Sequence, residues 1–353
     1  MRKWIDMHCD TLSEMKKQGI PSLNQTKLHV DKTRLIRGNS KAQFFACYVN
    51  TKEYRKEFTE KMDTETKPGH ARMDTKINSR NSEFNLDAAV WDRSWKAANE
   101  LIDLAYEQEA DDFGIVHTFE ELEKNLAADR LSGILTVEEG GILNRKMERL
   151  DQLYERGIRL MTLTWNYQNC IGNPNSREEQ VMQKGLTTFG KEVVERMNEL
   201  GILVDVSHLS DGGFWDCVQV SRKPIVASHS NARSLCPHPR NMTDEMLRAL
   251  GEKGGVAGVN FYSVFLCGEG RRATVDDMVQ HIRHMIHCAG EDAVALGTDF
   301  DGFEDTALPE GIRDVQDMEL LWDGMRKAGI TSRQIEKIAC NNILRALRET
   351  MNH

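Results

Sequence analysis

The sequence has no excess of positive charge. Its 46 Lys and Arg residues stand against 55 Asp and Glu, which gives a formal net charge of −9 at pH 7. The basic residues do not gather into a stripe that could follow a phosphate backbone. A nucleic acid is therefore not an expected partner.

The sequence also lacks a hydrophobic run long enough to cross a membrane, since no window reaches about 18 apolar residues. The N-terminal stretch MRKWIDMHCDTL begins with basic residues but has no apolar core, because His and Asp interrupt it at once. A hydrophobic tail that could direct lipid anchoring is missing too. We therefore expect a soluble, cytoplasmic protein with no signal peptide and no membrane partner.

Paired cysteines are missing as well. The 8 cysteines are scattered along the chain, and none belongs to a CxxC pair. In a long chain without a secretion signal we expect reduced thiols, most of them buried. The sequence contains neither a glycine-rich phosphate loop nor a GxSxG nucleophile motif.

What the sequence does contain is a series of short apolar runs of strand length. They cover residues 4–10, 42–49, 132–140, 158–165, 203–208, 224–229, 254–262 and 293–302. Nearly continuous runs of this kind are typical of strands buried on both faces. Helical patterns lie between most of them, for example 187–201, where Gly201 is placed to end a helix. The alternation predicts an α/β fold, a (β/α)₈ TIM barrel, with an open doubly wound sheet as the alternative.

Residues 51–88 do not fit this pattern, because they are rich in charges of both signs and poor in apolar side chains. We predict that residues 1–353 form one barrel domain with a polar insertion at about 51–88. The insertion follows the second predicted strand, on the side where a barrel's active site lies. A solvated excursion is expected, and a lid is the alternative.

Metal-capable side chains stand at the ends of most of the predicted strands. They are His8 and Asp10, Glu138 and Glu139, His208, His229, and Asp299 and Asp301. The carboxyl ends of barrel strands meet at one face, so these side chains are expected to converge. The spacing of His8 and Asp10 points both to the same side of their strand, whereas Cys9 should point away and pack.

This combination of histidines and carboxylates suits Zn²⁺. The set exceeds what one tetrahedral ion needs, and two ions bridged by one carboxylate and one hydroxide would use all of it. Such a pair lowers the pKa of the bridging water and polarises a carbonyl, which is hydrolytic chemistry.

The motifs DMHCDTL, VEEGG, TLTWN, DVSH, SHSNA, HPRN and GTDFDG occur in this order, followed by NNILR near the C-terminus. In order and content they resemble the renal (membrane) dipeptidase family, peptidase family M19 of the amidohydrolase superfamily. The resemblance covers essentially the whole chain outside 51–88. It implies a barrel of the metallo-dependent hydrolase type with two Zn²⁺ per chain. The implied enzyme is a metallo-dipeptidase that hydrolyses L-Xaa-L/D-Xaa dipeptides through a metal-bridging hydroxide.

The resemblance also implies the metal ligands. His8 and Asp10 match the ligands of the first zinc, and His208 and His229 match those of the second. Glu138 matches the bridging glutamate, which also belongs to the catalytic set. The distance along the sequence from Glu138 to the TLT motif favours Glu138 over Glu139 as the bridging residue.

Two further residues match groups that act on the substrate. Asp299 matches a carboxylate that takes a proton from the bridging water and passes it to the leaving amine. Arg240 matches an arginine that binds the substrate's C-terminal carboxylate or the developing oxyanion, for which a planar guanidinium is well shaped. Glu139 stands where the family usually has glycine.

The sequence departs from the family at Trp165, where well-studied members have a histidine that helps to hold the substrate carbonyl. An indole only donates and does not titrate. Either Asn166 or another group replaces that contact, or the substrate is a different amide, ester or lactone, which is the alternative function. Tyr262, at the end of the seventh predicted strand, is a further candidate substrate contact. A metal-binding scaffold without catalysis would lack a ligand, and none is missing.

Other polar residues receive structural interpretations. The HIRHMIH pattern of His281, His284 and His287 is expected on a solvated helix face. His238 is a candidate for the substrate cleft, Asp301 is expected to support its neighbours rather than bind metal, and Asp205 is expected to be structural. The expected partner is a dipeptide or a similar small amide, and a homodimer is an option because family members are often dimers.

Overall fold

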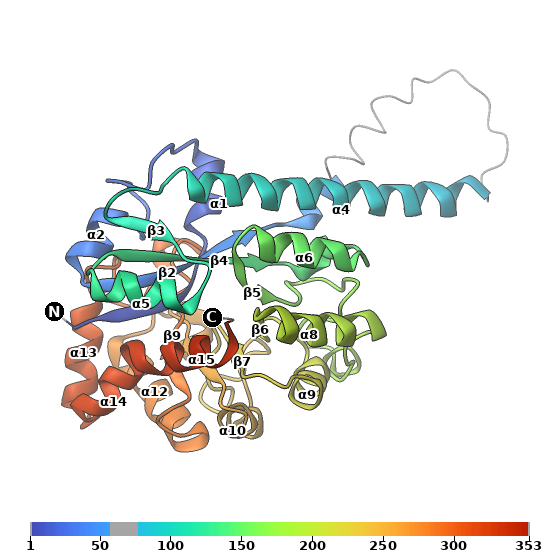
Figure 1. The fold of residues 1–353 in the computed structure, drawn as a ribbon. Coiled ribbons are helices and arrows are strands. Elements are labelled where there is room, and N and C mark those ends of the chain that lie inside the picture. The colour runs from blue at the N-terminus through green and yellow to red at the C-terminus, as the bar shows by residue number, and fades with distance from the viewer. Residues whose placement is uncertain (1, 57–76, 352–353) are drawn as a thin grey trace.

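The structure is a computed structural model that describes residues 2–56 and 77–351. In this part of the chain one parallel sheet contains β1 (Trp4–Cys9), β2 (Ser40–Tyr48), β3 (Phe113–Ile115), β4 (Leu131–Glu138), β5 (Ile158–Thr162), β6 (Leu203–Asp205), β7 (Ile225–Ala227), β8 (Val256–Val259) and β9 (Val294–Leu296). The order is β2-β1-β9-β8-β7-β6-β5-β4-β3, and an additional pairing joins β2 to β4. All strands except β3 therefore close into a barrel of eight, which confirms the predicted fold and rules out the open sheet (Figure 1).

The strand β3 was not predicted. It is three residues long and pairs Phe113 to Ile115 with Leu131 to Gly133 at the start of β4. A run this short has no periodicity that could distinguish it from a loop. Because β2 and β4 pair directly, β3 is an addition outside the ring.

Helices surround the sheet (Figure 1). They are α1 (Thr11–Gln18), α2 (Lys32–Arg37), α4 (Ile77–Tyr106), α5 (Phe119–Ala127), α6 (Met147–Glu155), α7 (Glu179–Met182), α8 (Thr188–Leu200), α9 (Asp211–Val220), α10 (Asp244–Glu252), α11 (Ser263–Cys267), α12 (Val275–Ala289), α13 (Met318–Lys327), α14 (Ser332–Glu336) and α15 (Asn342–Thr350). The predicted end of α8 is confirmed, since Gly201 adopts a left-handed conformation with φ of 83°. Thr274 begins α12 with a capping box that it forms with Asp277.

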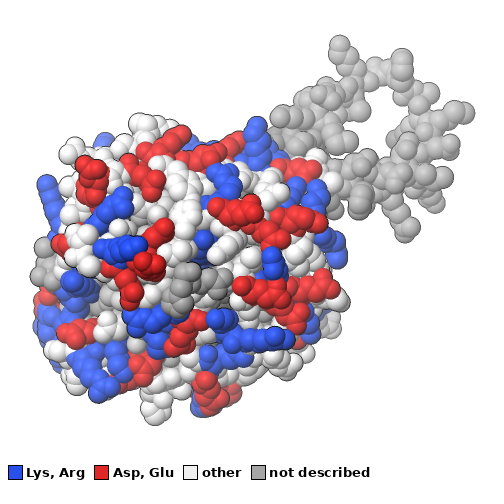
Figure 2. Space-filling view, viewed as in Figure 1, with Lys and Arg blue, Asp and Glu red and all other residues white. Residues whose placement is uncertain are grey.

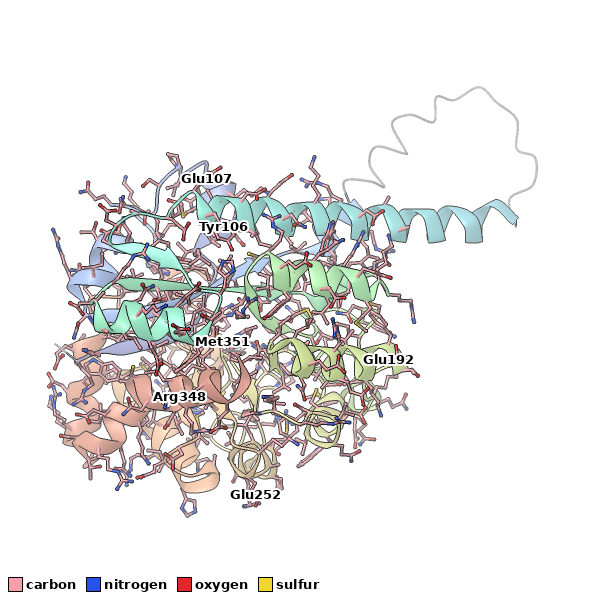
Figure 3. All side chains as sticks on the ribbon, in the orientation of Figure 1. Tyr106, Glu107, Glu192, Glu252, Arg348 and Met351 are labelled. Atoms are coloured by element: carbon pink, nitrogen blue, oxygen red, sulfur yellow. The ribbon has the colours of Figure 1, made fainter. Side chains whose placement is uncertain are left out.

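The core has an inner and an outer part. The inner cluster draws residues from every barrel strand, including Ile5, Phe44, Leu203 and Ala295, and continues into α15. The outer cluster lies between the sheet and the surrounding helices and contains Cys9. Figure 3 labels Met351, which follows α15 directly and belongs to the inner cluster. The strands are thus buried on both faces, as their apolar runs predicted.

The predicted insertion at 51–88 coincides partly with the start of α4. Residues 51–56 are helical, residues 57–76 lie outside the described part of the chain, and α4 begins at Ile77. The second half of α4 packs on the barrel through buried residues such as Ala98 and Ile102. The single-domain organisation with an insertion stays a prediction.

The surface that Figure 2 shows carries acidic and basic side chains interspersed, with no continuous basic area on this face. None of the described helices combines the length and the apolar composition that crossing a membrane would require.

Candidate metal centre

The five side chains predicted as metal ligands converge at the carboxyl ends of the strands. His8 Nε2 lies 3.4 Å from Asp10 Oδ2 and 3.5 Å from Glu138 Oε2. On the other side, His208 Nε2 and His229 Nε2 lie 3.0 Å and 3.5 Å from Glu138 Oε1. The two carboxylate oxygens of Glu138 therefore face two different groups of donors.

An irregularity in β1 produces this convergence. Ile5 and Met7 belong to the inner cluster, whereas Cys9 belongs to the outer one and contacts the carbonyl of Phe44. The register with β2 shifts between Asp6 and Cys9, which is the signature of a β-bulge. Without the extra residue, strict alternation from Met7 would direct His8 toward the surrounding helices.

Unusual backbone conformations place other members of the site. His208, Asp299 and Asp301 have φ values of 65°, 62° and 66°. Non-glycine residues adopt this left-handed region at a cost of about 1–3 kcal/mol each, and such residues concentrate at functional sites. Because β6 already ends at Asp205, a turn rather than the strand presents His208.

Hydrogen bonds fix the orientation of His229. Ser228 Oγ lies 2.6 Å from Asp205 Oδ2 and 2.7 Å from His229 Nδ1. Since the hydroxyl gives its single proton to the carboxylate, it accepts from His229 Nδ1–H. The lone pair of that imidazole is then on Nε2, which faces Glu138. Asp205 thus acts structurally, as expected.

Asn166 orients His208 in a similar way. Its Oδ1 lies 3.0 Å from His208 Nδ1, so the imidazole donates from Nδ1 and its Nε2 is free to accept. The sequence suggested Asn166 as a substrate contact, and the structure shows that it also touches a candidate ligand.

Several buried polar atoms of this cluster have no hydrogen bond from any described residue. They are His8 Nδ1 and Nε2 and Asp10 Oδ1. An unsatisfied buried polar group costs about 1–3 kcal/mol, so such groups call for an explanation. A cation in contact with His8 Nε2 and with Asp10 would satisfy atoms that make no hydrogen bond with the described residues. The residues present therefore fit a metal.

The electrostatics of His208 and His229 suit the same interpretation, whereas, despite burial, the charge of Glu138 raises the pKa of His8. Burial and the charge of Arg240 lower the pKa of His208 to about 4. Burial and the charge of His8 lower the pKa of His229 well below its usual value. Neutral imidazole is the form that binds metals.

Two of the carboxyl groups near His8, those of Glu138 and Asp299, differ sharply in pKa. Burial opposes ionisation of Glu138, but the positive charge of His8 beside its Oε2 and the close approach of His208 Nε2 to its Oε1 outweigh it, so the pKa lies below the usual range. At Asp299, burial and the charges of Asp10 and Glu138 raise the pKa to about 7, against the opposing charge of His8. A carboxyl group with such a pKa exchanges protons readily near neutrality.

Asp299 lies beside the first group of donors. Its Oδ1 is 3.7 Å from His8 Nε2, and its Oδ2 accepts a hydrogen bond of 2.9 Å from Asn260 Nδ2. Sequence reasoning missed Asn260, which directly follows β8 and could have been found from its position at a strand end. Asp301 instead accepts from Thr11 Oγ1 and from the backbone N–H of His29, both at 2.6 Å, and so supports the loop as expected.

A cavity of about 580 Å³ opens over these groups. It is lined by Asp10, Glu138, His208 and Asp299, and by four residues predicted to contact substrate, namely Arg240, Trp165, Asn166 and Tyr262. Arg240 is 6% exposed and donates to Ser230 Oγ and to the carbonyl of His229, while its Nε has no described partner. A buried guanidinium with a free donor is suited to an anionic group of a ligand.

Trp165 forms part of an aromatic wall in this cavity. Its ring centroid lies 5.0 Å from that of Tyr48 and 5.5 Å from that of Tyr167. Tyr262 forms another wall with Phe265 and Phe303, at 4.8 and 4.9 Å. The sequence did not identify Tyr48, although it is the last residue of β2 and pairs with Glu138.

The sequence model of the membrane dipeptidase family, peptidase family M19, matches residues 2–353 of this chain. The chain belongs to this family. It is therefore a metal-dependent hydrolase of the dipeptidase type, and the predicted resemblance is confirmed.

Individual relatives of this dipeptidase-family chain are consistent with its membership of the family. It is 38% identical over 204 residues to an uncharacterized dipeptidase of Schizosaccharomyces pombe, an alignment that covers 57% of this chain and 49% of that protein. A metallopeptidase of Rhodobacter sphaeroides, solved with a phosphinate mimic of the dipeptide L-Ala-D-Ala, has a TM-score of 0.80 and 25% identity, with 99% of both chains covered. A family M19 metallopeptidase named dipeptidase AC has a TM-score of 0.80 and 26% identity, with coverage of 100% of this chain and 99% of that one.

Two sequence-based interpretations in the dipeptidase chain need revision. His238 is not among the residues that line the cavity; its Nδ1 accepts from the N–H of Arg240 and its ring lies 4.6 Å from that of Phe265. Nor do the helix histidines share a solvated face, because His281 is buried and its Nδ1 accepts from the N–H of Ala232. Helical drift over six positions turns His281 toward the core.

Proposed function

We propose that this chain is a dinuclear zinc dipeptidase that cleaves the peptide bond of L-Xaa-L/D-Xaa dipeptides. One observation carries the proposal: the two oxygens of Glu138 face separate donor groups, His8 with Asp10 and His208 with His229. Each of these two groups would hold one ion, and Glu138 would be shared between the two ions. Imidazole and carboxylate donors in this combination suit zinc.

When bound, such a pair of ions lowers the pKa of a water molecule and polarises a carbonyl, which is the chemistry that amide hydrolysis needs. The chain's own residues would do the rest. Asp299 takes a proton from the attacking water and later gives it to the leaving amine, and its Oδ1, 3.7 Å from His8 Nε2, lies beside the proposed ligands where that proton is exchanged. Arg240 binds the C-terminal carboxylate of the dipeptide or the developing oxyanion through its planar guanidinium.

The walls of the cavity would orient the two side chains of the dipeptide. Trp165 with Tyr48 forms one aromatic surface, and Tyr262 with Phe265 forms another. Asn166 is held by His208 and lies at the same cavity, so it can offer its amide group to the substrate.

Trp165 also supports a second candidate function, hydrolysis of a different amide, an ester or a lactone. The indole stands beside Tyr48 and Tyr167 and supplies no acceptor at the position where family members have imidazole. A substrate without a dipeptide's backbone could use such an apolar wall better.

Two measurements test the proposal. Metal analysis of the purified protein should give close to two zinc ions per chain, and one ion or none would contradict the dinuclear arrangement. A panel of L,L- and L,D-dipeptides, with N-blocked dipeptides as controls, should show turnover of free dipeptides only. Activity confined to another amide, an ester or a lactone would favour the second function.

A further inference from the structure

A second group of metal-capable side chains lies outside the barrel, between α10 and α12. Asp244 is the first residue of α10, and His284 and Cys288 are one turn apart on α12. Their ligand atoms all lie within 4.8 Å of one another. The two helices pack side by side on the outer layer (Figure 1), so the group is separate from the cavity.

We propose that Asp244, His284 and Cys288 bind one divalent transition-metal ion of the zinc class, which ties α10 to α12. Nothing in the proposed dipeptidase chemistry uses these residues.

The ring nitrogen His284 Nε2 is the centre of the argument. It lies 2.8 Å from Asp244 Oδ1, 3.0 Å from Ser234 Oγ and 3.4 Å from Cys288 Sγ. A ring nitrogen offers one proton or one lone pair, so a single hydrogen bond satisfies it. Three polar atoms around one such nitrogen match the geometry of donors that share a cation.

The spacings are close to those of a tetrahedral site. Usual zinc bond lengths place two ligand atoms about 3.3 Å apart for nitrogen and oxygen and about 3.6 Å apart for nitrogen and sulfur. The observed separations of 2.8 and 3.4 Å differ from these values by no more than about half an ångström. Small side-chain rotations would therefore admit the ion, with Ser234 Oγ or a water molecule as the fourth ligand.

Access and charge also suit an ion. The side chains of Asp244 and His284 are 34% and 23% exposed, so an ion can enter from solvent. The carboxylate of Asp244 lies beside His284 and Cys288 and favours a cation there, and metal binding would remove the thiol proton of Cys288.

The site would stabilise the segment that carries Arg240. Ser234 and Arg240 belong to the same connection between β7 and α10, and Ser234 Oγ donates to Asp244 Oδ1 at the start of that helix. An ion at this point would fix one end of the connection to α12, so its expected effect is on thermal stability.

Cobalt substitution provides the test. The five cavity ligands contain no sulfur, so in the metal-free protein reloaded with Co²⁺ a thiolate-to-cobalt charge-transfer band can come only from another site. We expect this band in the wild type, with saturation at one cobalt ion per chain beyond those in the cavity. It should vanish in Cys288→Ser and in His284→Gln, which keeps a polar side chain for Asp244. Cys267→Ser, which changes another partly buried thiol, is the matched control and should retain the band.

Metal content gives a second measurement. Cys288→Ser should bind one ion fewer than the wild type, melt at a lower temperature in the presence of metal, and keep its hydrolytic turnover. No band in the wild type, a band that persists in Cys288→Ser, or a band that never saturates would overturn the proposal. If the wild type shows the band but has no dipeptidase activity, this result would count against the proposed function alone.

Discussion

The Nε2 atoms of His208 and His229 lie 3.0 Å apart. Both face the same oxygen of Glu138, and each ring donates its Nδ1–H elsewhere, so two lone pairs and a carboxylate oxygen point at one place. These electron pairs repel one another. Protonation does not relieve the repulsion, because the pKa of each imidazole is lowered. A cation between these atoms would turn the repulsion into coordination, which is the physical reason to expect a metal here.

The first prediction concerns Ser228. Ser228→Ala removes the acceptor that holds His229 in the tautomer with a free Nε2. Partners of this kind typically contribute about 10- to 100-fold to metal affinity. We expect a loss of this size in competition with a chelator. Ser221→Ala is the control. It removes a buried hydroxyl that donates to Asn198 and does not line the cavity, so this variant should bind metal normally. Unchanged affinity in Ser228→Ala would contradict the assignment.

The second prediction separates metal binding from proton transfer. Asp299→Asn keeps the shape of the side chain and its contact with Asn260 but cannot carry the proton. General acid–base groups contribute about 10²- to 10⁴-fold to turnover, so kcat should fall by that factor while the metal content stays at the wild-type level. Asp305→Asn, an exposed carboxylate of the following segment, should behave as wild type. Near-normal kcat in Asp299→Asn would remove this residue from the mechanism.

The third prediction concerns Glu139, which stands where the family usually has glycine. It is fully buried, and its Oε1 accepts from Asn169 Nδ2 at 2.6 Å, while Asn169 also donates to the carbonyl of Leu163 at 2.9 Å. These bonds hold the loop that carries Trp165. Glu139→Gly should therefore raise KM more than it lowers kcat, with metal content unchanged.

The same position allows a matched pair of variants. Glu139→Gln keeps an acceptor for Asn169 and should restore the wild-type KM. Because Glu139 has a φ of 109°, glycine also relieves backbone strain of about 1–3 kcal/mol. A higher melting temperature together with a higher KM would therefore distinguish loop positioning from simple destabilisation. Equal KM values for Glu139→Gly and Glu139→Gln would count against a role of Glu139 in positioning this loop.

The sequence predicted the convergence of the ligands because parallel strands bring their carboxyl ends together whatever their exact length. It therefore placed His8, Glu138 and His229 correctly at one face without any knowledge of distances. The same argument placed Asp299 at this face, whereas Arg240 was identified by the match of its HPRN motif to the family. Their chemical roles stay predictions.

Local deviations from regular structure could not be predicted. The bulge in β1 and the left-handed turn at His208 depend on neighbours that are distant in sequence. The predicted strand 203–208 was too long, because apolar content continues past Asp205 after the backbone has left the sheet. The cluster of Asp244, His284 and Cys288 was missed because it joins two helices whose contact no periodicity reveals.

The last prediction is a pH dependence of stability caused by His238. Burial and the charges of Arg240, Arg177 and Arg233 lower its pKa to about 4, from an ordinary value of 6.5. Between these values the unfolded chain binds a proton that the folded chain does not, so stability falls as the pH is lowered through this window. His238→Asn keeps an acceptor for the N–H of Arg240 but cannot titrate, so its free energy of unfolding should fall less steeply between pH 6.5 and 4. Urea unfolding of the metal-free proteins measures this difference without interference from metal release. Leu235→Ala, a change in the same connection that involves no proton, should keep the wild-type slope, and an equal slope in His238→Asn would show that this imidazole is protonated in the folded state.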